Sequence, residues 1–196
     1  KITEETNIPW VRLLYCYPDK ITDELISEIR DNQRIVKYLD IPIQHISDKM
    51  LRAMNRHGDS KMIKDTIARV RAAIPDITLR TTLIVGFPGE TEEDHRKTLD
   101  FLRRCAFSEL HVFPYSRRPG TPADRMPDQC THAVKAARAH AAQELGRRMH
   151  LEFLEQSVGQ TLPVLFETAE EGSVGHSDTY LLVKVPEEGL RWQLRQ

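Results

Sequence analysis

Two polar side chains that could contact a ligand, Gln44 and His45, come directly after an apolar segment at residues 38–43. In α/β proteins ligands bind where parallel strands end, so this pair is a candidate ligand contact. The His45 imidazole could titrate near neutral pH or bind a metal ion. The alternative is that His45 only begins the next helix and bonds to nearby backbone groups.

A second candidate lies inside the apolar segment 77–85. Arg80 has apolar neighbours there, and a buried guanidinium needs a partner. It therefore either forms an internal ion pair or clamps a carboxylate or phosphate of a ligand. Thr81 and Thr82 follow, and they alternate across the two faces of a strand, so one of them points to each side.

This segment stops at the sequence GFPGE, residues 86–90. Gly86 and Gly89 permit close contact with a ligand or unusual dihedral angles, and Pro88 fixes its own φ angle. The acid Glu90 comes next. A ligand site and an ordinary strand-to-helix turn both fit this pattern.

A third candidate follows the apolar segment 109–115. Arg117 and Arg118 stand on a loop rich in proline and glycine, beside the aromatic Tyr115. Adjacent arginines next to an aromatic ring could hold an RNA backbone or an anionic substrate. A solvated surface loop is the alternative.

Composition limits the possible functions. The chain has 196 residues and a net charge of −1, so no global basic field attracts nucleic acid. No apolar run is long enough to span a membrane, so we expect no membrane partner. The first residue is Lys1, which is typical of an internal cut or a processed end. Three cysteines stand far apart, which argues against a disulfide framework and against a metal or iron–sulfur site, and favours the cytoplasm: Cys16, Cys105 and Cys130.

Strand and helix signals alternate over the first two thirds of the chain. We expect strands at 10–17, 38–43, 77–85 and 109–115, and helices that begin at Thr22, Ser47, Ser60 and Thr91. Such alternation predicts an α/β fold with parallel strands and right-handed crossovers. Four strands are too few for a closed eight-stranded barrel, so they form an open sheet or one part of a larger barrel.

The last third has a different character. Residues 130–156 predict one long helix, and β-rich segments follow at 162–167, 179–185 and 190–194, the first two divided by a Gly/Ser/Glu loop. We expect three parts: a β/α unit at 1–128, a connecting helix at 129–156 and a small, incomplete β module at 157–196.

Three segments in this order resemble the radical S-adenosylmethionine methylthiotransferases: YLDIPIQHISDKMLRAMNRHG, LRTTLIVGFPGETEED and HVFPYSRRPGTPA. The resemblance implies that residues 1–128 are the C-terminal part of a partial, TIM-like radical SAM barrel. Residues 157–196 would be a truncated β-barrel of the TRAM type. Members of the family add a methylthio group to a C–H bond, using S-adenosylmethionine and two 4Fe–4S clusters.

The chain departs from the family in its cysteines. The CxxxCxxC motif of the radical cluster and the three cysteines of the auxiliary cluster are not in this sequence. The resemblance therefore implies that this chain alone is inactive, and it assigns no metal ligand and no catalytic residue. A fragment, a misassembled gene and a chimera all fit this departure.

The resemblance also implies which residues contact S-adenosylmethionine. Eight positions match motifs that border the cofactor: Gln44, His45, Arg80, Thr82, Gly86, Glu90, Phe113 and Tyr115. Arg117 and Arg118 would contact the substrate or RNA. The implied partners are a tRNA or ribosomal protein substrate and an electron donor protein.

Two branches of the family match different parts of the chain. Residues 10–89 resemble the branch that modifies an aspartate of the twelfth small-subunit ribosomal protein. Residues 107–185 resemble the branch that modifies threonylcarbamoyl-adenosine beside the tRNA anticodon. The expected substrate is tRNA, because the β module and the arginine loop are the parts that would read the substrate. The alternatives are the ribosomal protein and a non-catalytic RNA-binding fragment.

Overall fold

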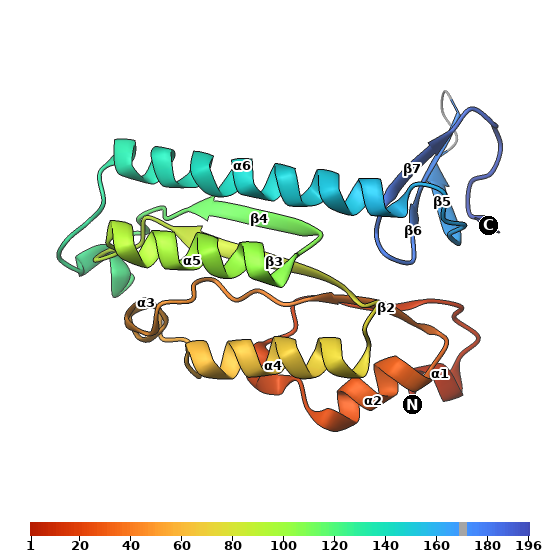
Figure 1. The fold of residues 1–196 in the computed structure, drawn as a ribbon, viewed down its shortest axis with the longest axis horizontal. Helices are drawn as coiled ribbons and strands as arrows, with labels where there is room; N and C mark the ends of the chain where they lie inside the picture. The colour runs from red at the N-terminus through yellow and green to blue at the C-terminus, as the bar shows by residue number, and fades with distance from the viewer. Residues whose placement is uncertain (169–171) are drawn as a thin grey trace.

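The computed structural model describes residues 1–168 and 172–196. Within them, four parallel strands form one sheet and lie side by side in chain order (Figure 1): β1 (Val11–Leu13), β2 (Ile35–Asp40), β3 (Thr78–Val85) and β4 (Glu109–Pro114). This order, without a reversal of direction, fits one part of a β/α barrel, whereas a doubly wound sheet reverses its strand order at a switch point. The expected α/β class with parallel strands is confirmed.

All helices of this part except the first contribute residues to the apolar core on one face of the sheet. The helices are α1 (Ile2–Glu5), α2 (Asp23–Asp31), α3 (Asp48–Ala53), α4 (Ser60–Ala73), α5 (Glu92–Cys105) and α6 (His132–Ser157), with short 3₁₀ turns η1 (Pro18–Lys20) and η2 (Ala123–Arg125). Side chains of threonine and aspartate begin four of them: Thr22 accepts from the Leu25 N–H, Asp59 from the Met62 N–H, Thr91 from the Asp94 N–H and Thr131 from the Val134 N–H.

The two faces of the sheet differ in chemistry. In β3, Leu79, Leu83 and Val85 lie in the apolar core with residues of α4, α5 and α6. Because side chains alternate along a strand, the opposite face carries the other residues of each strand. We call this opposite face the inner face; its residues are Arg12, Val36, Tyr38, Asp40, Thr78, Arg80, Thr82, Ile84, Glu109, His111 and Phe113.

Two strands differ from the sequence prediction, β1 in its length and β2 in its position. β1 ends at Leu13, and the chain turns soon after it because Tyr15 has a φ angle of 57°. β2 begins at Ile35 and ends at Asp40, earlier than the predicted segment 38–43. Beyond it the chain stays beside β3 through single bonds, such as Gln44 N–H to the Thr82 carbonyl at 2.9 Å.

The β module follows α6, and this long helix passes along the whole length of strand β4 (Figure 1). Its strands form an antiparallel sheet in the order β7-β6-β5-β8: β5 (Val164–Thr168), β6 (Ser173–Ser177), β7 (Leu182–Val185) and β8 (Leu194–Arg195). The sequence predicts a loop where β6 lies; residues 169–171 of that loop lie outside the described residues. The segments predicted at 179–185 and 190–194 contain only the shorter β7 and the beginning of β8.

A second contact joins the module to the barrel strands. The Arg12 guanidinium donates to the Ser177 carbonyl at 2.8 Å and lies 4.5 Å from the centre of the Tyr180 ring. The rings of Tyr38 and Tyr180 are 5.4 Å apart, so an inner-face residue of β2 also touches the module. The module is therefore attached both through α6 and through this seam.

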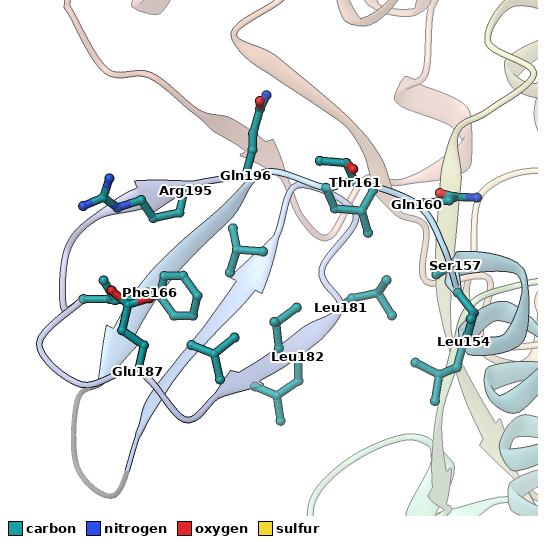
Figure 2. A pocket seen from close by; sticks show the side chains of 16 residues that line it. Leu154, Ser157, Gln160, Thr161, Phe166, Leu181, Leu182, Glu187, Arg195 and Gln196 are labelled. Atoms are coloured by element: carbon teal, nitrogen blue, oxygen red, sulfur yellow. The ribbon is translucent and has the colours of Figure 1, made fainter.

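An open apolar groove of about 790 Å³ lies between the end of α6 and the β module. Figure 2 shows Leu154 of α6 on one side and Phe166 and Leu182 of the module on the other. In the described ranges, no helix combines the length and the apolar character needed to cross a membrane.

Candidate functional site

The turn after β3 is held by a buried carboxylate. The side chain of Glu90 accepts hydrogen bonds from the Gly86 N–H at 2.5 Å, from His45 Nε2 at 3.0 Å and from Arg138 Nη1 at 2.7 Å. The side chains of Glu90, His45 and Arg138 are 0%, 1% and 9% exposed. Gly86 has a φ angle of 70°, which favours glycine at this position. These bonds join three segments of the chain at the turn.

Both ring nitrogens of His45 are hydrogen-bonded, Nε2 to Glu90 of the turn and Nδ1 to the backbone that follows His45. Its Nδ1 accepts from the backbone N–H groups of Ile46 and Ser47, at 3.0 and 2.9 Å. The proton is therefore assigned to Nε2, which donates to Glu90. The sequence predicts, as the alternative to a ligand contact, that His45 bonds to nearby backbone groups, and such backbone bonds are present. A contact between His45 and the cofactor stays a prediction.

The pKa of Glu90 lies below its ordinary value. Burial alone raises the pKa of this carboxyl, but the hydrogen bonds from His45 and Gly86 and the charge of Arg138 outweigh that effect. Glu90 is therefore an anion in the folded chain. Arg138 was not among the predicted site residues. Its sequence signal is that it stands between two alanines, whose small side chains let α6 approach the turn closely.

Gln44 lies at a pocket at the carboxyl edge of the sheet. The pocket has a volume of about 510 Å³ and is lined by Gln44, Ile84 and Phe87 and by the loop residues Thr121 and Met126, among others. The φ angle of Gln44 is 64°, an unusual conformation for a residue other than glycine. Its side-chain oxygen is buried and finds no hydrogen-bond partner among the described residues. A ligand with a hydrogen-bond donor would complete this site.

Arg80 lies on the inner face and forms an internal cluster. Its Nη2 lies 2.7 Å from His111 Nδ1, and its Nε lies 3.5 Å from a carboxylate oxygen of Glu109. The internal ion pair predicted for Arg80 is present, and its contact with a ligand stays a prediction. Thr82 and Phe113 share the inner face with it, and Phe113 is 55% exposed.

The other predicted residues lie outside the inner face. The ring of Tyr115 packs edge-on against Phe87, with 5.0 Å between the centroids. Arg117 donates to the Asp124 carboxylate at 2.9 Å and to the Asp124 carbonyl at 2.8 Å, so it closes its own loop. Arg118 is exposed to solvent.

The helix that follows the turn begins with a capping box. Asp94 accepts from the Ser47 hydroxyl at 2.7 Å and from the Thr91 N–H and hydroxyl at 3.0 and 2.7 Å. Burial raises the pKa of Asp94, but these bonds and the nearby Lys49 outweigh burial and hold the pKa well below its ordinary value. α5 is thereby fixed to the segment that carries His45.

Acid should therefore weaken the fold through Asp94. A carboxyl with a lowered folded-state pKa stabilises the fold fully above its unfolded pKa, about 4, and less as pH falls below it. We expect the urea midpoint of the wild type to fall between about pH 5 and pH 3, and Asp94→Asn to show a smaller fall. An Asp94→Asn variant with the same pH dependence as the wild type would contradict this role.

The cysteines do not form a metal site. Within residues 1–168 and 172–196, no group of three or more histidine, cysteine or acidic side chains could hold a metal ion. Cys130 lies beside the turn instead, with its sulfur 3.6 Å from the Phe87 carbonyl oxygen. The described residues thus do not fit an iron–sulfur cluster, whereas the pocket at Gln44 fits an organic ligand.

The fold and the site define an open parallel β/α sheet with a pocket at the carboxyl ends of its strands. The model of the Radical SAM superfamily matches residues 2–102, and the chain belongs to this superfamily. Membership implies S-adenosylmethionine and a 4Fe–4S cluster as the cofactors of the superfamily.

Curated relatives narrow the family. Three of them are named ribosomal protein uS12 methylthiotransferase RimO. The one from Alkaliphilus oremlandii is 46% identical over 85% of this chain and 38% of its own length. The one from Geobacter sulfurreducens is 56% identical over 67% of this chain and 29% of its own length. The one from Pelobacter propionicus is 43% identical over 94% of this chain and 40% of its own length. The resemblance to the methylthiotransferases is confirmed, and the chain spans well under half of these relatives.

Solved structures share the fold. Coproporphyrinogen III oxidase (HemN) from Escherichia coli, a radical SAM enzyme, superposes with a TM-score of 0.54 and 22% identity, over 76% of this chain and 32% of that one. Elp3 from Methanocaldococcus infernus superposes with a TM-score of 0.52 and 13% identity, over 83% and 51%. At these identities the likeness concerns the fold alone.

Proposed function

We propose that this chain is part of a radical SAM methylthiotransferase that adds a methylthio group to an aspartate of ribosomal protein uS12. The observation that carries the proposal is the identity of 42–56% to relatives that bear this name. The match to the Pelobacter propionicus relative covers 184 of the 196 residues. It therefore includes most of the segment 107–185, which resembles the tRNA branch.

The ribosomal protein has more support as the substrate than tRNA, which the sequence favours. The tRNA expectation rests partly on the Arg117–Arg118 loop. In the structure Arg117 is 56% exposed, but its guanidinium pairs with the Asp124 carboxylate, which neutralises its charge. Among the described residues Arg118 has no such carboxylate partner. One arginine without a neutralising partner is a weak basis for binding a phosphate backbone, because such binding grows with the number of phosphate contacts.

The pocket at Gln44 is the proposed place for S-adenosylmethionine. When bound, this cofactor would supply the methyl group and, with a 4Fe–4S cluster, the radical that removes hydrogen from the substrate. The Gln44 oxygen would accept a hydrogen bond from it, and Ile84 and Phe87 would exclude water. The Glu90 brace keeps the neighbouring turn in place. Thr82 and Phe113 would border the cofactor from the inner face.

Further parts of the proposal concern the whole enzyme. We place the ligands of its two clusters outside this chain, so that the chain alone would be inactive. Residues 157–196 would belong to a TRAM module, residues 1–128 to the barrel and residues 129–156 to the connecting helix. An electron donor protein would serve the enzyme in the cytoplasm, where ribosomes are.

The test is the modification state of the two candidate substrates. In a strain that lacks the gene, we expect uS12 to lose one methylthio group on an aspartate, and tRNA to keep its methylthio nucleosides. Mass spectrometry of uS12 and of digested tRNA measures both, and the intact gene restores the uS12 group. Loss of the tRNA modification with unchanged uS12 would replace this proposal with the tRNA function.

A further inference from the structure

The edge strand β4 presents an unused row of side chains to the inner face. Leu110 and Val112 pack against the apolar core, so Glu109, His111 and Phe113 point to the opposite side. The side chains of Glu109 and His111 are 40% and 37% exposed, and Phe113 is 55% exposed. This row can therefore contact another molecule.

The imidazole of His111 is fixed by its two nitrogens. The Arg80 Nη2 atom lies 2.7 Å from Nδ1 and 2.5 Å from Nε2, so the guanidinium lies over one face of the ring. Nε2 is also 3.1 Å from a carboxylate oxygen of Glu109. The side chain is still 37% exposed, and a partner can approach the ring face that lies away from Arg80. The His111 ring meets the Phe113 ring at 68° with 6.4 Å between the centroids.

Glu109 supplies the carboxylate of this row. Arg80 has Asp40 as its register partner on β2 and Glu109 as its partner on β4, so one guanidinium lies between two carboxylates. Asp40 is fully buried, whereas Glu109 is accessible. Arg80 orients the Glu109 carboxylate at 3.5 Å, and its oxygens keep lone pairs for a further donor.

We propose that Glu109, together with the ring faces of His111 and Phe113, binds an arginine or lysine side chain of the substrate protein. A cation above an aromatic face and beside a carboxylate is stabilised by the cation–π interaction and by a charge-assisted hydrogen bond. This inference rests on the proposed function, because a ribosomal protein binds RNA with lysine and arginine and thus brings such cations. Arg80 is a positioning residue in this subsite.

Peptide binding tests the subsite. The probes are a fluorescent uS12 peptide that spans the modified aspartate and the same peptide with citrulline for arginine and acetyl-lysine for lysine. We expect the wild-type chain to bind the charged peptide about tenfold more tightly than the neutral one. In Glu109→Gln this preference should fall to less than about twofold, since glutamine keeps the shape and removes the charge.

Two further variants separate the subsite from general effects. Glu155→Gln, on the exposed side of α6, should keep the tenfold preference. Phe113→Ala, at an exposed position, should weaken the charged peptide more than the neutral one. An unchanged preference in Glu109→Gln would overturn the inference, as would an RNA oligonucleotide that binds more tightly than the peptide and gains affinity in Glu109→Gln.

This outcome is separable from the fate of the proposed function. The strain without the gene could lose the uS12 modification while the chain binds the charged and the neutral peptide with equal affinity. In that case only the inference of a cation subsite is rejected. If uS12 is unchanged in that strain, the proposed function itself fails.

Discussion

Replacing Glu90 by glutamine is expected to lower the free energy of unfolding by about 3–5 kcal/mol. The side chain keeps its shape, but the Arg138 guanidinium, 9% exposed, loses the anion 2.7 Å away. The remaining carboxylate beside Arg138, that of Glu92, lies 3.6 Å away and is 82% exposed, so it compensates the buried cation poorly. Urea denaturation followed by circular dichroism measures the loss.

A double-mutant cycle shows whether the pair is the cause. Adding Arg138→Met to Glu90→Gln removes the orphaned charge and should recover about 1–3 kcal/mol of the loss. Glu152→Gln, an exposed glutamate on α6, is the matched control and should change the stability by less than about 0.5 kcal/mol. If Glu90→Gln is as stable as this control, the carboxylate does not brace the turn.

Gly175→Ala is expected to separate β5 from β6 and to destabilise the β module by about 3 kcal/mol. A Cβ atom at this position would lie 2.2 Å from the Leu165 carbonyl oxygen and 2.6 Å from the Phe166 Cα. Both are backbone atoms, so no side chain can move aside. Hydrogen exchange of the β5 and β6 amides should accelerate, while the β2 and β3 amides keep their protection.

The control for this variant is another glycine. Gly159 has a φ angle of 81°, but a Cβ atom added there would meet no described atom within 4 Å, so Gly159→Ala adds backbone strain of about 1 kcal/mol without a clash. Equal exchange rates at β5 in the two variants would mean that the close approach of the strands at Gly175 is not what limits the module.

Local signals made the barrel part predictable. Thr22 and Thr91 begin helices as expected, because a cap and its acceptor lie within one turn of the chain. The apolar segment 77–85 became β3 with its predicted end before Gly86. Strand β6 was not predicted, because glycine and serine carry little strand signal and the pairing with β5 supplies its stability.

The site was less predictable because its bonds are not local. Glu90 and Arg138 are 48 residues apart in the chain, and Arg80 and His111 are 31 apart. The sequence placed Gln44, Arg80 and the turn near one another through strand order alone. It could not tell whether Arg80 faces a ligand or an ion-pair partner, since that depends on which residue stands beside it on β4.

The seam at Arg12 has a consequence for the freedom of the β module. A body joined to another by one helix can still rotate about the axis of that helix. The bond from Arg12 to Ser177 and the contact of Tyr38 with Tyr180 lie away from α6, so rotation about α6 would break them. Two separate points of attachment remove this rotational degree of freedom. The module therefore keeps a fixed orientation relative to the inner face.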